Sequence, residues 1–411
     1  MENNSYDLIV VGSGPSGLIA AITAARGGKS VLVLEKMPKP ALKLKASGGG
    51  RCNLSNTLTI DQFLDPFGKS SRFMRNALEN FTKDHLVKFL DSIGVKVKIA
   101  DGFRIFPSTH NSQTVTDAFI KELDRLNITL ITSCEVLKLY TNKDKLSHIS
   151  TTKGDFKALN YLVATGGCGY ETLGGSVNSF DFIKEIGHTI TPLYPAMIPI
   201  KLKESWVSNC KADTIPKATI KIDIKKYSRL NATGDLIFTN SGIRGPVVLD
   251  FSRYITPLFN KYDEIPLLVN LTQNRNEDQL HTILKDDFIK DPKKTIVQNL
   301  LTILPLSLSK ELLKLVDIKE DEKFNKLNGQ KKQNLLKTVA WTPLNAIGTD
   351  GFSKAMVTNG GVSLKQIDQN SMGSKIFTNL YFAGEVLDID GPCGGYNLQW
   401  AFSSGVLAAK S

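Results

Sequence analysis

The sequence predicts an α/β fold in which both ends of the chain contribute to one domain. Three short apolar segments of strand character, at 6–11, 159–164 and 380–383, each end in a glycine-containing turn. Such turns at the ends of buried strands are typical of nucleotide-binding α/β domains. Between the second and third segments, the region 191–349 changes from strand-like to helical periodicity, which predicts an insertion.

The length and composition indicate a globular protein with more than one domain. The 411 residues exceed what one hydrophobic core usually supports, and the 41% hydrophobic and 22% charged residues are ordinary for a soluble protein. No apolar run has the length of a transmembrane helix, and the start of the chain lacks the pattern of a signal peptide. The five cysteines form no CxxC pair, so we expect no disulfide scaffold, no metal site and a reducing, cytoplasmic location.

The net charge of +11 is unevenly distributed along the chain. Residues 36–51 contain five basic residues and no acidic residue, and residues 201–230 contain eight basic residues against three acidic ones. A lysine-rich surface without a specific role and a surface for a polyanionic partner both explain this excess. The sequence shows no arginine-rich arm or RNA-binding motif that decides between them.

The N-terminal segment has the features of a dinucleotide-binding βαβ unit. A buried strand over 6–11 leads into GSGPSG, an alanine-rich helix and a second strand that ends at Glu35. Gly12 allows the tight turn, Gly14 lets a pyrophosphate approach the backbone, and Gly17 permits close helix packing. The helix N-terminus favours phosphate binding, and Glu35 has the position of an acid that accepts ribose hydroxyls, which disfavours NADP.

The C-terminal segment favours FAD as the bound dinucleotide. A short strand is followed by Gly384-Glu385, an acidic loop and a helix expected to begin at Gly395. The positive end of that helix suits the electron-rich pyrimidine side of a reduced flavin. The segment 159–169, a strand ending in Thr-Gly-Gly, is typical of a chain that passes beside the same nucleotide. We therefore expect an FAD-binding, Rossmann-like domain of the glutathione-reductase type, built from both termini.

Several rarer motifs extend the pattern along nearly the whole chain. They include SGGGRCN, FRIFPS, GHTITPLYPA, GDLIFTNSGIRGPVVL and VTNGGVSL. In this order they resemble a family of FAD-dependent oxidoreductases labelled aminoacetone-oxidase-like or NAD(P)/FAD-dependent flavoproteins, which includes a ribosomal-RNA dihydrouridine synthase and a bile-acid enone reductase. The resemblance implies an FAD-binding domain over 1–190 and 350–411, an inserted β-rich domain over 191–272 and 339–349, and a helical subdomain over 273–338.

The periodicity of the inserted region agrees with this layout. Strand-like segments are expected at 218–227, 235–239, 246–252 and 265–272, and helical segments at 277–289, 294–304, 308–316 and 329–339. The helical part contains twelve lysines and ten acidic residues, which indicates a solvated face and not a polyanion-binding one.

The candidate cofactor-binding residues belong to these motifs and their flanks. They are Gly12, Ser13, Gly14, Pro15, Ser16, Gly17, Glu35, Lys36, Lys43, Ser47, Gly48, Gly49, Gly50, Arg51, Cys52, Asn53, Val136, Thr165, Gly166, Gly167, Gly384, Glu385, Asp390, Gly394, Gly395, Tyr396, Asn397 and Leu398. Lys43 and Arg51 are expected within reach of phosphates, from the cofactor, an incoming nicotinamide dinucleotide or RNA.

The candidate catalytic residues are Cys52, Cys393, Tyr396 and Arg244. Each cysteine is a candidate nucleophile or proton donor, or a small thiol packed under the cofactor. Tyr396 is an alternative proton donor. The sequence departs from the family pattern at Asn240, where a His is usual, and at Arg244, where a Ser is usual. Arg244 suits an anionic substrate, and a surface salt bridge explains it equally well.

These features favour a flavin-dependent reductase. Only one dinucleotide-binding motif is present, so NADH or NADPH would dock transiently as the reductant. The resemblance and the charge favour reduction of uridine to dihydrouridine in 23S ribosomal RNA by hydride transfer from N5 of the reduced flavin. The alternatives are a small-molecule enone reductase or amine oxidase that uses FAD, and a non-catalytic, flavin-containing RNA-binding protein.

Overall fold

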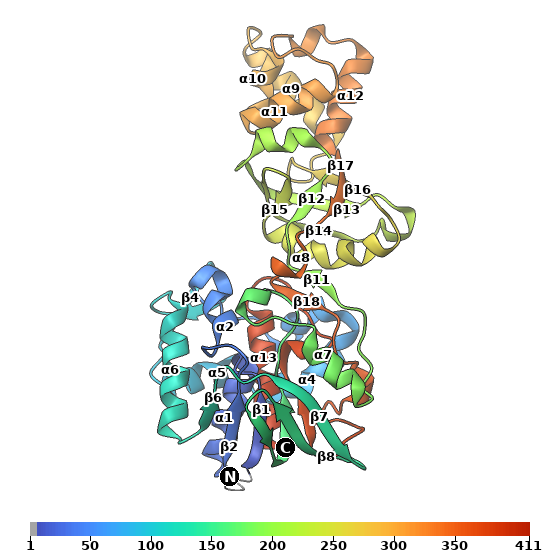
Figure 1. Ribbon diagram of the computed structural model, residues 1–411. Helices are drawn as coiled ribbons and strands as arrows, with labels where there is room; N and C mark the ends of the chain where they lie inside the picture. The colour runs from blue at the N-terminus through green and yellow to red at the C-terminus, as the bar shows by residue number, and fades with distance from the viewer. Residues whose placement is uncertain (1–5) are drawn as a thin grey trace. The chain divides into compact units, whose positions relative to one another are not determined.

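The structure is a computed structural model that describes residues 6–411 and forms two compact units (Figure 1). Unit 1 contains the described residues up to Pro195 together with Phe352–Ser411, so both ends of the chain build it. Unit 2 is Ala196–Gly351, and its strand and helix segments share one hydrophobic core. The three-part domain division expected from the sequence stays a prediction.

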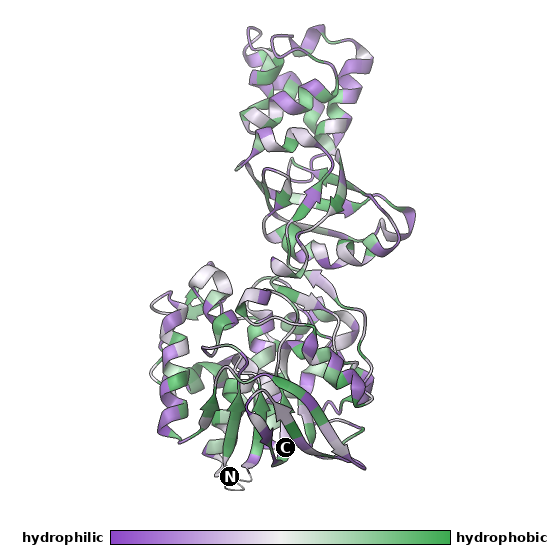
Figure 2. Cartoon of the chain, viewed as in Figure 1, coloured by the Kyte–Doolittle hydropathy of each residue, from purple (hydrophilic) through white to green (hydrophobic). Residues whose placement is uncertain are grey.

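Unit 1 is organised around a five-stranded parallel sheet of order β19-β10-β1-β2-β6. The apolar runs that predicted the strands form its centre, where β1 and β2 pair in register and bury their aliphatic side chains. Figure 2 shows these strands as hydrophobic, whereas the outer helix α6 carries hydrophilic residues. The strands are β1 (Tyr6–Val11), β2 (Val31–Leu34), β6 (Thr129–Ile131), β10 (Ala158–Val163) and β19 (Leu380–Phe382).

Two helices from opposite ends of the chain pack closely in unit 1. Helix α1 (Pro15–Arg26) follows β1, and helix α13 (Tyr396–Lys410) ends the chain. A Cβ atom at Gly405 of α13 would lie 2.4 Å from the carbonyl oxygen of Ser16 in α1. The two backbones therefore meet at a position where only glycine fits, which ties the C-terminal segment to the first βαβ unit.

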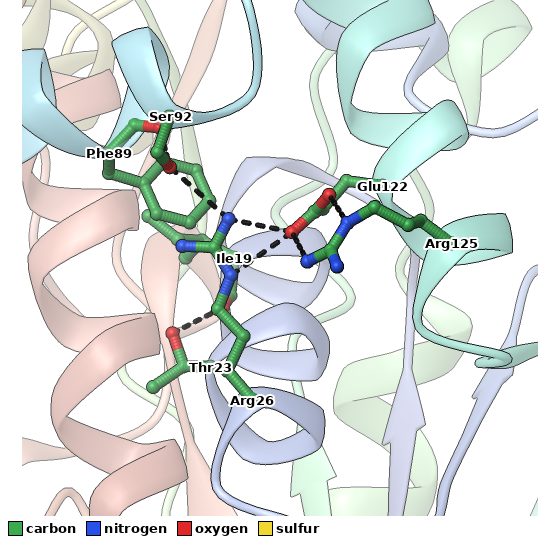
Figure 3. A network of polar contacts seen from close by, with 7 residues as sticks. All are labelled: Ile19, Thr23, Arg26, Phe89, Ser92, Glu122 and Arg125. Atoms are coloured by element: carbon green, nitrogen blue, oxygen red, sulfur yellow. Dashed lines mark hydrogen bonds and ion pairs between the residues drawn. The ribbon is translucent and has the colours of Figure 1, made fainter.

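A buried carboxylate joins three helices of unit 1 (Figure 3). Glu122 on α6 (Ser112–Arg125) accepts from Arg26 Nη2 at 2.6 Å and from Arg125 Nε at 2.7 Å. Arg26 also donates to Ser92 Oγ on α5 (Lys83–Ser92) at 3.2 Å and lies over the ring of Phe89. Hydrogen bonds from Arg125 and Arg26 lower the pKa of Glu122 to about 2, so the carboxylate stays charged at neutral pH.

Smaller elements complete unit 1. A three-stranded antiparallel sheet, β7-β8-β9, lies in the chain between β6 and β10, a second one has the order β3-β5-β4, and β11 pairs with β18. The remaining elements are α2 (Leu42–Ala46), β3 (Ser55–Asn56), α3 (Ile60–Leu64), α4 (Ser71–Asn80), β4 (Val97–Ala100), β5 (Arg104–Pro107), β7 (Val136–Asn142), β8 (Lys145–Thr151), β9 (Gly154–Phe156), α7 (Asn178–Glu185), β11 (Tyr194–Ala196) and β18 (Val357–Asn359).

Unit 2 contains a closed antiparallel barrel of order β12-β15-β14-β13-β16-β17. The strand expected at 246–252 is wrong, because this segment lies in helix α8 (Pro246–Ile255). Pro246 occupies the first turn, and Val247, Phe251 and Ile255 are buried at helical spacing. The short run of Val and Leu at the start of this segment also fits a strand, which explains the wrong prediction. The barrel strands are β12 (Ile200–Leu202), β13 (Thr214–Ile222), β14 (Asn231–Phe238), β15 (Gly242–Arg244), β16 (Ile265–Asn270) and β17 (Thr342–Gly348).

Four helices occupy the chain between β16 and β17. Helix α9 begins with a capping box in which Asn276 and Gln279 exchange side-chain-to-backbone hydrogen bonds, and Thr295 and Gln298 do the same for α10. These capping boxes help to explain why the segments with helical periodicity form helices in the structure. The helices are α9 (Glu277–Lys290), α10 (Ile296–Leu300), α11 (Leu306–Leu315) and α12 (Gly329–Ala340).

Candidate active site

Three polar turns meet at the carboxyl ends of β1, β10 and β19. A Cβ atom at Gly12, after β1, would lie 2.5 Å from the carbonyl oxygen of Ala164, after β10. A Cβ atom at Gly384, after β19, would lie 2.5 Å from Ser16 Oγ in the first turn of α1. Segments far apart in the sequence therefore form one contiguous edge of the sheet, where parallel α/β folds bind their ligands.

The glycines of the first turn serve different purposes. A Cβ atom at Gly17 would lie 2.0 Å from the carbonyl oxygen of Gly12, so close packing of α1 on β1 requires glycine there. A Cβ atom at Gly14 would meet no atom within 4 Å. No steric contact among residues 6–411 requires glycine at position 14, whereas a phosphate group approaching the start of α1 would explain it.

Thr165 provides a second indication of a bound group at this edge. Its hydroxyl is buried and has no hydrogen-bond partner within the described residues 6–411. The neighbouring Gly166 has a left-handed backbone (φ +74°), and a Cβ atom there would meet no atom within 4 Å. An unsatisfied buried hydroxyl beside open space fits a polar ligand. The ADP half of FAD has oxygen atoms that can accept from the Thr165 hydroxyl and phosphates that fit the open space at Gly14.

Glu35 lies beside the first glycine turn. Its Oε2 accepts from the backbone N–H of Ser13 at 3.0 Å and from the Ser13 hydroxyl, and its Oε1 accepts from the N–H of Met37 at 2.8 Å. The protein thus fixes the orientation of the carboxylate at the end of β2. Recognition of a ribose by Glu35 stays a prediction.

The loop 47–53, with the sequence SGGGRCN, is a left-handed turn. Gly48, Gly49 and Gly50 have φ values of +59°, +65° and +84°, and the N–H of Cys52 donates to the carbonyl oxygen of Ser47 at 3.0 Å. Three successive residues with positive φ explain the run of three glycines, because side chains strain that conformation. At Gly49 and Gly50 a Cβ atom would meet no atom within 4 Å, so this part of the loop faces open space.

The start of α13 contacts this loop. Gly395 precedes the helix in a left-handed conformation, and a Cβ atom there would lie 2.5 Å from the backbone of Ser55. With its amide oriented to satisfy both neighbours, Asn53 accepts from the N–H of Gly395 at 3.0 Å and donates to the carbonyl oxygen of Ser55 at 3.1 Å. Asn397 makes two hydrogen bonds to the backbone of Gly391, so the loop before α13 is held in place.

An ion pair connects helix α2 with the turn that follows β19. Lys43 Nζ lies 2.8 Å from Glu385 Oε2, and Glu385 Oε1 accepts from the N–H of Thr358 at 2.9 Å. The sequence suggested that Lys43 contacts phosphates, and the structure gives it a carboxylate partner. Thr358 was not among the predicted site residues, although the VTNGG motif that contains it was a signal that could have identified it.

Burial changes the expected chemistry of Cys52. The side chain is fully buried, and burial raises its pKa to about 12, so the thiol stays protonated at physiological pH. This environment favours the packing role over the nucleophilic one. Cys393, in the loop before α13, is partly exposed.

The other catalytic candidates have different environments. The ring of Tyr396 is buried against Phe63 and Phe67, with centroids at 4.8 and 5.9 Å. Arg244 is exposed on β15 of unit 2. The catalytic roles of Cys393, Tyr396 and Arg244 stay predictions.

The remaining cofactor candidates surround the same turns. Asp390 is buried and accepts from Asn359 Nδ2 at 2.9 Å, a partner that the sequence did not predict. Val136 begins β7 close in sequence to Cys134, whose N–H donates to the carbonyl oxygen of Glu35 at 2.9 Å. Contacts of these residues, and of Lys36 and Leu398, with a cofactor stay predictions.

No helix among residues 6–411 is long and apolar enough to cross a lipid bilayer. In the same part of the chain, no group of three or more His, Cys, Asp or Glu side chains is arranged to hold a metal ion.

Comparison with known proteins identifies relatives along the full length of the chain. The family model described as HI0933-like protein Rossmann domain matches residues 6–411. A 3-dehydro-bile acid delta(4,6)-reductase of Clostridium scindens is 30% identical over 98% of this chain and 98% of its own. A ribosomal RNA dihydrouridine synthase of Escherichia coli is 28% identical over 99% of each chain.

Solved structures support the same fold. A 3-ketosteroid delta1-dehydrogenase from Sterolibacterium denitrificans covers 99% of each chain with a TM-score of 0.56 at 13% identity. The strand ends, the open space at Gly14 and the buried hydroxyl of Thr165 fit FAD, in agreement with these comparisons. The chain belongs to the HI0933-like family and is an FAD-dependent oxidoreductase.

Proposed function

We propose that this enzyme reduces uridine to dihydrouridine in 23S ribosomal RNA, with NADH or NADPH as the reductant. The observation that carries the RNA assignment is a group of unpaired cations in unit 2. The E. coli relative named a ribosomal RNA dihydrouridine synthase, which matches the whole chain, supports the reaction.

The cations lie on the hairpin formed by β13 and β14, which we call the basic hairpin. Within residues 6–411, none of its five basic side chains has an acidic partner. Two aromatic rings accompany them: Lys221 Nζ lies 3.9 Å from the ring centroid of Trp341, and Lys226 lies over Tyr227. The five basic residues are Lys217, Lys221, Lys225, Lys226 and Arg229.

A surface of this kind suits a nucleic acid. Unpaired cations neutralise phosphates and release counterions, which supplies most of the affinity for a folded RNA. Aromatic rings among the cations offer stacking platforms for unpaired bases. Neither feature is needed for a small, uncharged substrate.

The residues of unit 1 provide the environment for the chemistry. FAD, when bound, supplies hydride transfer. The turn at Gly14 and the hydroxyl of Thr165 bind the dinucleotide, and the positive end of α13 favours negative charge near Gly395 and Tyr396. The Lys43–Glu385 pair holds helix α2 against the turn after β19.

Deletion of the gene, followed by mass-spectrometric mapping of dihydrouridine in 23S RNA, tests this proposal. We expect one dihydrouridine to disappear from the RNA and to return when the wild-type gene is restored. An unchanged modification profile would overturn the RNA assignment and leave the FAD assignment intact.

The C. scindens relative favours a second candidate function, the reduction of a small enone. Uracil and an enone both contain a carbon–carbon double bond polarised by a carbonyl group, so one site suits either acceptor. Reoxidation of the reduced holoenzyme by a 3-oxo-Δ4 steroid at a rate exceeding that with RNA would favour this candidate.

A further inference from the structure

Three basic side chains gather around one buried aromatic ring in unit 1. The guanidinium carbons of Arg51 and Arg104 lie 5.4 and 5.9 Å from the ring centroid of Phe106, and the imidazole of His110 lies 5.3 Å from it. Phe106 is almost fully buried on β5, whereas Arg51 is exposed and the other two are partly exposed. We call these four residues the Phe106 cluster.

The Phe106 cluster lies against the loop 47–53. A Cβ atom at Gly48 would lie 3.7 Å from Cε1 of Phe106, and the N–H of Leu54 donates to the carbonyl oxygen of Ile105 at 2.8 Å. Arg51 is itself a residue of this loop. The cluster therefore lies on the same part of unit 1 as the left-handed glycines that face open space.

Two side-chain nitrogen atoms of the cluster, one on Arg104 and one on His110, have no hydrogen-bond partner within the described residues. These atoms, Arg104 Nε and His110 Nδ1, are buried. The one acidic residue paired with the cluster is Asp101, which accepts from Arg104 Nη2 and leaves Nε unsatisfied. A buried donor such as Arg104 Nε is unfavourable without an acceptor, so a ligand that supplies acceptors here is favoured.

Helix α6 adds to the positive potential. It begins at Ser112, two residues after His110, with Asn111 as its cap. The hydroxyl of Ser112 donates to the carbonyl oxygen of Lys45, which places this helix start against the segment preceding loop 47–53. The cations and the helix N-terminus together favour an anion with several oxygen acceptors.

We propose that the Phe106 cluster binds the phosphates of the nicotinamide dinucleotide that reduces the enzyme. This inference rests on the proposed function, which requires such a reductant. The sequence has one dinucleotide-binding glycine motif, and the structure places that motif at the end of β1 as part of the FAD edge. Arg51 and Arg104 provide planar donors for phosphate oxygens, and His110 provides a further one.

Direct binding to the oxidised holoenzyme tests the proposal. In isothermal titration calorimetry with NAD+ and with NADP+, the double variant R51Q/R104Q is expected to raise the Kd of the preferred dinucleotide at least tenfold. Each protein is titrated in the presence of excess FAD, and its flavin absorbance is recorded, so that the Kd refers to FAD-loaded protein. The matched control K121Q removes an exposed cation from α6 outside the cluster and should leave the Kd unchanged.

A second measurement uses the wild-type holoenzyme, so its result does not depend on whether the substitutions disrupt the loop in the variant. Inorganic pyrophosphate is expected to compete with the dinucleotide for binding. An unchanged Kd in R51Q/R104Q, or absence of competition by pyrophosphate, would overturn the inference. Weakened RNA binding with an unchanged dinucleotide Kd would also overturn it and assign the cluster to RNA phosphates.

The failure of the proposed function has a different signature. If neither NADH nor NADPH binds or reduces the wild-type holoenzyme, the proposed reductant is wrong, and the inference falls with it. If a dinucleotide reduces the wild type and the variant with equal affinity, the inference alone is wrong.

Discussion

The two units leave different groups without partners. In unit 1, the open space at Gly14 and the buried hydroxyl of Thr165, which has no partner among residues 6–411, lie at the edge where three turns meet. In unit 2, the basic hairpin carries five cations without acidic partners among residues 6–411, of which Lys221 is partly exposed and the other four are exposed. A small polar ligand suits the first arrangement and an extended polyanion the second, so we expect mutations to separate cofactor binding from substrate recognition.

Within unit 2, the cations of the helical segment and those of the basic hairpin differ in whether they have acidic partners. Four of the twelve lysines in the helical segment have acidic partners; Lys294 lies 2.7 Å from Asp287, and Lys314 lies 2.7 Å from Glu311. The near balance of charge in this segment predicted a solvated face from the sequence. Net charge alone does not locate an RNA surface, because it does not show which cations are already neutralised.

The largest expected effect comes from the glycines of the first turn. G17A introduces a Cβ atom 2.0 Å from the carbonyl oxygen of Gly12, which displaces α1 from β1. We expect a loss of about 2–4 kcal/mol in the free energy of unfolding and no retained FAD. Urea unfolding and the flavin absorbance of the purified protein measure both effects.

The matched variant G14A sharpens this prediction. Its Cβ atom meets no protein atom within 4 Å, so the apoprotein should unfold within about 0.5 kcal/mol of the wild type. FAD affinity should nevertheless fall about tenfold or more, or about 1.4 kcal/mol, because the methyl group occupies the pyrophosphate approach. Unchanged FAD affinity in G14A would contradict the assignment of this edge.

The second effect concerns the basic hairpin. The variant K221Q/K225Q/K226Q/R229Q should weaken binding of 23S RNA fragments and reduce the slope of log K against log salt by about 3, since each phosphate contact contributes about 0.7–0.9. Filter binding at several salt concentrations measures the slope. The control K294Q/K310Q/K314Q removes lysines that have acidic partners. An equal decrease of the slope in this control would contradict the assignment of RNA binding to the basic hairpin.

Glu122 offers a smaller effect that is confined to unit 1. E122Q removes the carboxylate that joins Arg26 and Arg125, and we expect a loss of about 1–2 kcal/mol at pH 7, near the low end because Arg125 is exposed to solvent. The pKa of Glu122 is lowered to about 2 from an ordinary 4.5, so its stabilisation is present above pH 4.5 and is lost as the pH falls toward 2. The difference between wild type and E122Q in urea unfolding should therefore shrink on acidification, and a constant difference would refute this account.

The smallest effect is expected at Cys52. Because burial raises the pKa of this thiol to about 12, iodoacetamide should not modify it in the native protein between pH 7 and 9. Mass spectrometry of digests identifies the modified cysteines. C52A should keep its turnover within about threefold of wild type, since the removed group packs and does not react; a loss of several orders of magnitude would restore the catalytic role.

Much of unit 1 was predictable because its signals are local. The strand ending at Val11, the glycine turn and the helix beginning near Gly395 each depend on a short pattern, and the structure confirms the FAD-type Rossmann fold that they predict. Helix α8 was missed because its buried residues form a run that also suits a strand, and only packing in unit 2 decides between them.

The site was predictable in its motifs but not in its pairings. The partners of Lys43 and Asp390 come from segments more than 30 residues away, at Glu385 and Asn359, and spacing does not specify such pairs. The Phe106 cluster combines a loop, a strand and a helix start in the same way. Three successive glycines suggested close approach to a ligand. Their left-handed backbone conformation is known only from the structure.

The most direct test of the separation between the two units follows both half-reactions in the hairpin variant. Stopped-flow absorbance gives the rate of flavin reduction by NAD(P)H, and the same signal gives the rate of reoxidation by 23S RNA. We predict that K221Q/K225Q/K226Q/R229Q is reduced at the wild-type rate and reoxidised by RNA at least tenfold more slowly at subsaturating RNA. If RNA reoxidises the variant at the wild-type rate, or if the variant loses the same factor in the rates of both half-reactions, the assignment of cofactor binding to unit 1 and RNA recognition to the basic hairpin is contradicted.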